Sequence, residues 1–164
     1  MARVEARRGD IFFIPGGLIH SIGGGYRVYE VQQSSDTTFR FHDWNRTDPA
    51  TGRPRELHLR QSFEAIDWTL PQPRVIPKIP YGDDHNTRWD VLNHPCFSFR
   101  CLNLREPARF PGDEESCLIL RVTSGACRVG GVPSATGADL LVPAGAPLTL
   151  EPEPGGAHLL ITTL

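Results

Sequence analysis

The sequence predicts an all-β protein built from two blocks of short strands that are joined by an extended linker. The chain has 16 glycines and 15 prolines among 164 residues, which is too many for long helices and suits strands joined by tight turns. Its apolar runs are short, and turn residues bound them. We expect the two blocks at residues 1–69 and 96–164, with a proline-rich linker at residues 70–95.

The composition argues against several kinds of partner. Hydrophobic residues make up 39%, charged residues 22%, and the formal net charge is −2, so nothing favours a nucleic-acid partner. No apolar run approaches the roughly 20 residues that span a bilayer, and the N-terminal residues lack the apolar core of a signal peptide. We therefore expect a cytoplasmic protein without a membrane partner. The four cysteines have no C-x-x-C spacing, and we expect reduced thiols.

The first block is predicted to contain three strands. Residues 11–14 form an apolar run between two turns that contain glycine. Residues 26–33 follow three consecutive glycines and place Glu30 and Gln32 on the same face. Residues 37–44 are rich in threonine and aromatic residues and are predicted to pair with them as an antiparallel strand.

Polar residues are expected to shape the remainder of this block. Asp36 is predicted to fix the turn between the second and third strands by bonding to backbone amides. A polar surface loop follows, and after it Ser62 is predicted to cap one helical turn that begins near Phe63. Charged residues around the loop are candidates for a shallow anion site, although such residues are usually only solvated; they are Arg46, Arg55 and His58.

The second block is predicted to be a small sandwich or barrel, because short apolar segments alternate with glycine- and proline-rich turns. The predicted strands are residues 97–104, 117–122, 126–129, 139–142 and 158–162.

One segment of the second block resembles a segment of the first. Residues 137–145 (GADLLVPAG) repeat the pattern of residues 9–17 (GDIFFIPGG), so the blocks are predicted to be copies of one architecture. His20 follows the first segment, whereas Leu148 stands at the equivalent position after the second. Only the first block therefore offers a metal ligand at this position.

Residues 9–20 (GDIFFIPGGLIH) combine an apolar strand, a sharp turn and His20. Proline and glycine reverse the chain, and a neutral imidazole is a good zinc ligand. A histidine after such a turn can equally be a hydrogen-bonded core residue, so these residues alone leave both interpretations open. The stretch resembles the second cupin motif, Pro-x-Gly-x-x-His. This resemblance implies a cupin-like jelly roll with the imidazole as a metal ligand.

The continuation resembles the signature of type I, zinc-dependent mannose-6-phosphate isomerases. The matching residues are 29–46 (YEVQQSSDTTFRFHDWNR) and 55–58 (RELH). The resemblance implies that residues 1–69 are the C-terminal part of a catalytic cupin. It also implies that residues 96–164 are a second, metal-free cupin-like barrel. The implied reaction interconverts mannose 6-phosphate and fructose 6-phosphate.

The same resemblance assigns roles to individual residues. His20 matches the last histidine ligand of the catalytic zinc, Glu30 the acidic residue on the next strand, and Arg40 the arginine that faces the sugar phosphate. Gln32 shares a side with Glu30 and is a candidate substrate contact. Isomerisation through an enediol needs a proton-transfer group and a group that stabilises an oxyanion, and a carboxylate and a guanidinium suit these tasks. Ordinary structural pairing within a sheet is the alternative for Glu30 and Arg40, and a structural role is the alternative for Gln32.

The zinc site is expected to be incomplete in this chain. In the family, the other ligands lie on an earlier strand that carries a Gln-x-His motif, whereas residues 1–8 offer only Glu5. His20 with Glu30 falls short of the three protein ligands typical of catalytic zinc. We therefore expect weak zinc binding and little or no activity from the chain alone. A separate N-terminal half or self-association is the expected source of the missing groups.

Two other hypotheses stay open. The chain could be a degenerate cupin that binds sugar phosphates as a regulatory module without catalysis, and the missing ligands favour that hypothesis. A free-standing metal cupin of another class, such as a dioxygenase or an epimerase, would need further ligands. No residue of the sequence has the spacing to supply them.

Overall fold

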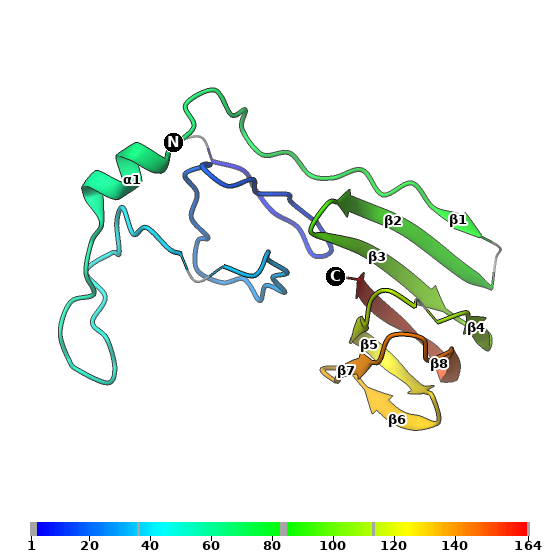
Figure 1. Cartoon of the computed structure of the whole chain (residues 1–164). Helices are drawn as coiled ribbons and strands as arrows, with labels where there is room; N and C mark the ends of the chain where they lie inside the picture. The colour runs from blue at the N-terminus through cyan, green and yellow to red at the C-terminus, as the bar shows by residue number, and fades with distance from the viewer. Residues whose placement is uncertain (1–2, 36, 83–84, 113, 164) are drawn as a thin grey trace. The chain divides into compact units, whose positions relative to one another are not determined.

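The computed structural model describes residues 3–35, 37–82, 85–112 and 114–163. The chain divides into two compact units, Met1–Ile76 and Pro77–Leu164 (Figure 1). Within the described residues, all of the strands belong to the second unit and the helix belongs to the first.

The second unit is one antiparallel sheet of eight strands within the described residues (Figure 1). The path through the sheet is β1-β2-β3-β8-β5-β6, with β4 paired to β8 and β7 paired to β5. The strands are β1 (Tyr81–Gly82), β2 (Asn86–His94), β3 (Phe97–Leu104), β4 (Ala108–Phe110), β5 (Leu118–Val129), β6 (Val132–Ala135), β7 (Asp139–Val142) and β8 (Leu148–Thr163).

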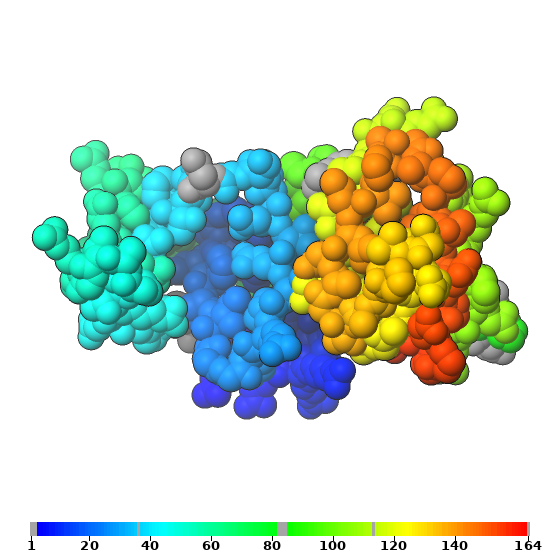
Figure 2. All heavy atoms as spheres, turned by 90° about the horizontal axis from the view of Figure 1, so that it is seen from below, coloured from blue at the N-terminus to red at the C-terminus, as the bar shows by residue number. Residues whose placement is uncertain are grey.

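The core of the second unit follows from the two-residue period of its strands. In β5, Leu118, Leu120 and Val122 are buried, while the residues between them are more exposed. The same alternation in β3 and β8 directs leucines to one interior. The yellow and orange atoms of this unit form a continuous surface in the space-filling view (Figure 2). The sheet therefore curls around a single apolar core.

A glycine contact bends the two longest strands. The β5–β8 register shifts on both sides of the pairing between Gly125 and Ala157. Gly125 has φ +77°, and a Cβ atom there would overlap the carbonyl oxygen of Gly156. The bend lets the first part of β5 pair with β7 and its last part pair with β6. Glycine is required here because both the backbone conformation and the available space exclude a side chain.

The all-β prediction is confirmed, and β3 and β7 have the predicted bounds. The strands predicted at residues 117–122 and 126–129 are joined in the structure into one continuous strand, β5, which begins at Leu118. The predicted linker, residues 70–95, differs from the structure because residues 86–94 form β2 and pair with β3. The prolines of this segment stop at Pro80 and resume at Pro95. The residues between them keep every backbone donor that a strand needs.

The first unit contains one helix and two isolated β-bridges among its described residues, Phe12 with Val75 and Thr47 with Pro54. The strands predicted at residues 26–33 and 37–44 do not form. β-propensity favours a strand only where a neighbouring strand satisfies its backbone groups, and no described segment forms a strand ladder with these residues. Asp36 lies outside the described residues.

The helix α1 (Leu59–Ala65) begins earlier than predicted. His58 occupies the N-cap position, and its carbonyl oxygen accepts a hydrogen bond from the Ser62 amide at 2.7 Å. Ser62 is buried inside the helix, so its predicted capping role is wrong. Among the described residues, no helix has the length and hydropathy to cross a bilayer.

Candidate functional site

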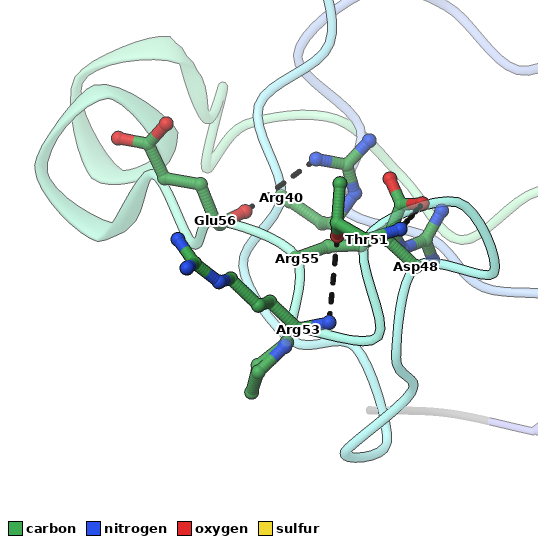
Figure 3. Close-up of a pocket in the computed structure, with 7 residues that line it drawn as sticks. Arg40, Asp48, Thr51, Arg53, Arg55 and Glu56 are labelled. Atoms are coloured by element: carbon green, nitrogen blue, oxygen red, sulfur yellow. Dashed lines mark hydrogen bonds between the residues drawn. The ribbon is translucent and has the colours of Figure 1, made fainter.

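The first unit has a pocket of about 620 Å³ whose lining includes three arginines, Arg40, Arg53 and Arg55. Asp48, Thr51, Pro54 and Glu56 complete the lining. The close-up shows these side chains projecting from two neighbouring stretches of chain (Figure 3). Three guanidinium groups beside two carboxylates leave the pocket with an excess of positive charge.

A tight turn positions one side of the pocket. The Arg46 amide donates to the Asp43 carbonyl oxygen at 3.0 Å, and the two central residues, Trp44 and Asn45, have φ of 51° and 54°. Two consecutive left-handed residues define a type I′ turn, which joins antiparallel segments. The chain therefore reverses at this turn.

A second loop closes the opposite side of the pocket. The Asp48 carboxylate accepts hydrogen bonds from the amides of Ala50 at 2.7 Å and Thr51 at 3.3 Å. The Asp48 amide donates to the Arg53 carbonyl oxygen at 2.8 Å. These bonds fix an Asx-type turn, which holds Arg53 at the rim.

Arg55 is held by a carboxylate that is not part of the pocket lining. Its Nε donates to Asp43 Oδ2 at 2.8 Å, and its Nη2 pairs with Oδ1 of the same carboxylate. Asp43 is buried at 7% exposure. Its hydrogen bonds to the Arg55 guanidinium hold the pKa of this carboxyl below its ordinary value of 3.8. This bidentate pair therefore engages the Arg55 guanidinium and leaves it less available to a ligand in the pocket.

Arg40 and Arg53 differ from Arg55 in having no ion-pair partner. No described carboxylate lies within ion-pairing distance of either guanidinium. Arg40 Nη1 donates to the Glu56 carbonyl oxygen at 3.4 Å (Figure 3). Its backbone is held by His58, whose amide donates to the Arg40 carbonyl oxygen at 2.8 Å. Arg40 is half-buried and anchored, yet most of its donors stay available. An anion is the ligand that such donors suit.

The structure does not bring the four predicted site residues together. His20 is exposed, and its Nδ1 lies 2.9 Å from the Leu18 carbonyl oxygen. Glu30 is also exposed, and Gln32 lines a separate pocket. No hydrogen bond or ion pair in the described chain joins any two of His20, Glu30, Gln32 and Arg40. The predicted juxtaposition required paired strands, and this unit lacks them among its described residues.

The described residues do not fit a catalytic zinc ion. They contain no group of three His, Cys, Asp or Glu side chains placed to hold a metal. Catalytic zinc typically has three protein ligands, and His20 supplies one imidazole. The described residues therefore form a pocket with an excess of positive charge, and none of them are grouped to hold a metal ion.

Sequence reasoning missed part of this pocket. Arg53 was not predicted, because an arginine in a polar loop resembles any solvated charge. The pairing of Asp43 with Arg55 was also missed, because Arg55 was considered only as a solvated loop residue or a candidate for a shallow anion site with Arg46 and His58. The signal that could have revealed the pair is the turn between them, since it places residues on its two arms opposite each other.

The chain is similar over part of its length to curated mannose-6-phosphate isomerases. It is 44% identical over 80 residues to mannose-6-phosphate isomerase ManA of Bacillus subtilis, a match that covers 49% of this chain and 22% of that protein. It is 42% identical over 66 residues to mannose-6-phosphate isomerase of Streptococcus mutans, covering 40% of this chain and 21% of that protein. Over part of its length, the chain is homologous to mannose-6-phosphate isomerases. No family model matches.

The homology covers about a fifth of each isomerase. A solved structure of the Bacillus subtilis mannose 6-phosphate isomerase superimposes with a TM-score of 0.67. The match has 23% sequence identity and covers 80% of this chain and 42% of that chain. The expected all-β, cupin-like fold is thereby confirmed.

Proposed function

We propose that this chain forms the substrate-facing C-terminal portion of a cytoplasmic sugar-phosphate isomerase that interconverts mannose 6-phosphate and fructose 6-phosphate. The observation that carries the proposal is the pair of guanidinium groups of Arg40 and Arg53 in one pocket, with no described carboxylate paired to either. Arg40 lies within the stretch that resembles the isomerase signature. A phosphate dianion would satisfy the free donors of both groups.

The proposed roles follow from the reaction. Aldose–ketose exchange moves a proton between C1 and C2 of the sugar, and negative charge develops on oxygen in the enediolate. Arg40 is proposed to stabilise negative charge on the substrate, and Glu30 is proposed as a proton-transfer group. Gln32 is proposed to contact a sugar hydroxyl. These roles require the segment around residues 26–33 to pack beside Arg40, which an additional partner would have to bring about.

The proposal includes zinc only if groups outside the described residues supply most of its ligands. His20 would be one ligand, and an N-terminal half of the enzyme would supply the others. The roles proposed for Arg40, Glu30 and Gln32 do not involve the metal, because the residues that would hold it are not assembled. We therefore expect the 164-residue chain to bind mannose 6-phosphate without turning it over.

The test measures binding and turnover separately. Mannose 6-phosphate, but not mannose, should shift the NMR signals of pocket residues, and Arg40→Ala should abolish the shift. Arg46→Ala is the matched control, because this exposed arginine lies outside the pocket lining. Equal binding of mannose and its phosphate would contradict the anion-binding role of the pocket.

Turnover is measured with zinc present, with and without the N-terminal region of the Bacillus subtilis relative. Zinc-dependent isomerisation that appears only when the N-terminal region is added supports the enzyme proposal. Isomerisation by the chain alone would refute the expectation that the chain binds mannose 6-phosphate without turning it over. The alternative is a sugar-phosphate-binding module without catalysis, favoured by the lack of a metal-binding trio among the described residues. Phosphate-dependent binding that chelators leave unchanged, with no restored turnover, would establish that alternative.

A further inference from the structure

Residues 56–58 hold Arg40 at three points. The Arg40 carbonyl oxygen accepts a hydrogen bond from the His58 amide at 2.8 Å. The Arg40 amide donates to Nδ1 of the His58 imidazole at 3.2 Å. The Arg40 guanidinium donates through Nη1 to the Glu56 carbonyl oxygen at 3.4 Å (Figure 3). His58 therefore makes two of the three bonds, and one of them uses its side chain.

The side-chain bond replaces a bond that two antiparallel segments would normally form through their backbones. Opposed residues of such a pair can exchange two hydrogen bonds, in which each amide donates to the other residue's carbonyl oxygen. The backbone of His58 is not extended, with φ −112° and ψ 54°, and its carbonyl oxygen accepts from the Ser62 amide at 2.7 Å. That bond begins helix α1. The imidazole therefore supplies the acceptor for the Arg40 amide.

The same bond determines which nitrogen of the imidazole carries the proton. A ring nitrogen that accepts a hydrogen bond has no proton of its own, so the neutral His58 ring is protonated at Nε2. Nε2 lies 3.9 Å from Glu56 Oε2, so a carboxylate faces the protonated nitrogen. The Phe39 ring lies edge-on to the imidazole, with the ring centroids 6.2 Å apart. These contacts hold the ring with Nδ1 toward the Arg40 amide.

The backbone of Arg40 determines where its guanidinium lies. A long side chain loses rotamer freedom when it binds a ligand, and groups that are already held in place lose less. Two bonds from His58 hold the Arg40 backbone, and the Glu56 carbonyl oxygen holds one nitrogen of its guanidinium. The other donors of Arg40 remain for a ligand of the pocket that this arginine lines.

We infer that His58 is a positioning residue for Arg40, whose unprotonated Nδ1 keeps the arginine in the conformation that receives the substrate anion. The inference rests on the proposed function, in which Arg40 stabilises negative charge on a sugar phosphate. Among the described residues, the pocket lining includes Arg40 but not His58. His58 therefore acts on the ligand through Arg40.

Three substitutions of His58 separate this role from the capping of helix α1. His58→Asn keeps an acceptor in the place of Nδ1, because Oδ1 of asparagine is the same number of bonds from the backbone. His58→Ser keeps a good N-cap residue, but its hydroxyl oxygen is one bond closer to the backbone and does not reach the Arg40 amide. His58→Ala provides neither the acceptor nor the cap.

The first measurement is the binding of mannose 6-phosphate and of inorganic phosphate to the full chain by isothermal titration calorimetry. His58→Ala and His58→Ser should each weaken binding about fivefold, which is the net effect expected for one hydrogen bond. His58→Asn should bind within about twofold of the parent chain. Arg60→Ala is the matched control, because it removes the Arg60–Glu64 ion pair of α1 without removing a bond to Arg40. It should leave binding unchanged.

The second measurement needs no ligand. Long-range proton–nitrogen NMR of the parent chain should show His58 as the tautomer that is protonated at Nε2. The Arg40 amide should exchange with deuterium about fivefold faster in His58→Ala and His58→Ser than in the parent chain, because its acceptor is lost. His58→Asn should retain the slower exchange.

The outcomes distinguish this inference from the proposed function. Equal binding by the parent chain and all three His58 variants would overturn the positioning role and leave the anion-binding pocket intact. Recovery by His58→Ser as complete as by His58→Asn would assign His58 to helix capping alone, and a ring protonated at Nδ1 would also overturn the inference. If the parent chain does not bind mannose 6-phosphate, the proposed function fails. The exchange of the Arg40 amide then decides whether His58 holds this residue.

Discussion

Gly125→Ala tests the bend in the sheet. A left-handed backbone costs a residue with a Cβ about 1–2 kcal/mol, and the stiffer unfolded chain returns about 0.4–1 kcal/mol. The new Cβ would also overlap the Gly156 carbonyl oxygen and lie 3.0 Å from Ala157 Cα, so β5 and β8 must separate locally. Overpacking of this kind adds about 1–3 kcal/mol. We expect a total loss of about 3 kcal/mol.

Gly130→Ala is the matched control. Gly130 also has positive φ, at +56°, but a Cβ there would meet no atom within 4 Å. Its cost should stay below about 1 kcal/mol. A domain of this size loses about 4–8 °C of melting temperature per kcal/mol, so Gly125→Ala should melt about 15 °C lower in calorimetry. Hydrogen exchange in β5 would assign the transition to the second unit. Equal losses for the two variants would refute the steric argument.

Three further predictions concern single residues. A carboxyl whose pKa is lowered on folding contributes stability above its ordinary pKa of 3.8 and loses it as the pH falls below that value. Asp43 should therefore titrate below pH 3.8 by carbon NMR, and Arg55→Ala should return its midpoint toward 3.8. Burial raises the pKa of the Cys127 thiol, so at pH 8 iodoacetamide should modify the exposed Cys96 first, as peptide mass spectrometry would show. Equal rates would contradict this order. Trp44→Asn should relieve a left-handed strain of about 1 kcal/mol and slow exchange at the turn about fivefold; faster exchange would show that the Trp44 ring contacts outweigh the strain.

The sequence allowed prediction of those elements whose determinants are local. β3 and β7 combine apolar residues with flanking turns, and both were predicted at their bounds. β2 was missed because Arg88, Asp90 and Asn93 obscure its alternation, and its strand state depends on pairing with β3. The strands expected at residues 26–33 and 37–44 have high propensity, but propensity does not provide a neighbouring strand.

The same distinction applies to the pocket. Arg40 was predicted from a motif, and it does line the pocket. Arg55 is paired with Asp43, which lies 12 residues earlier in the sequence. The two side chains meet only because the chain reverses between them. Whether an arginine is free to bind a ligand is decided by its neighbours in space. One sequence does not reveal those neighbours.

The position of β8 in the sheet affects how the second unit is synthesised and folded. β8 pairs with β3, β4 and β5, yet it follows all other strands of the sheet in the sequence. While the ribosome is still making it, β3 and β5 each lack a neighbour and expose leucines that are later buried. Long-range pairing of this kind slows folding and prolongs exposure to aggregation.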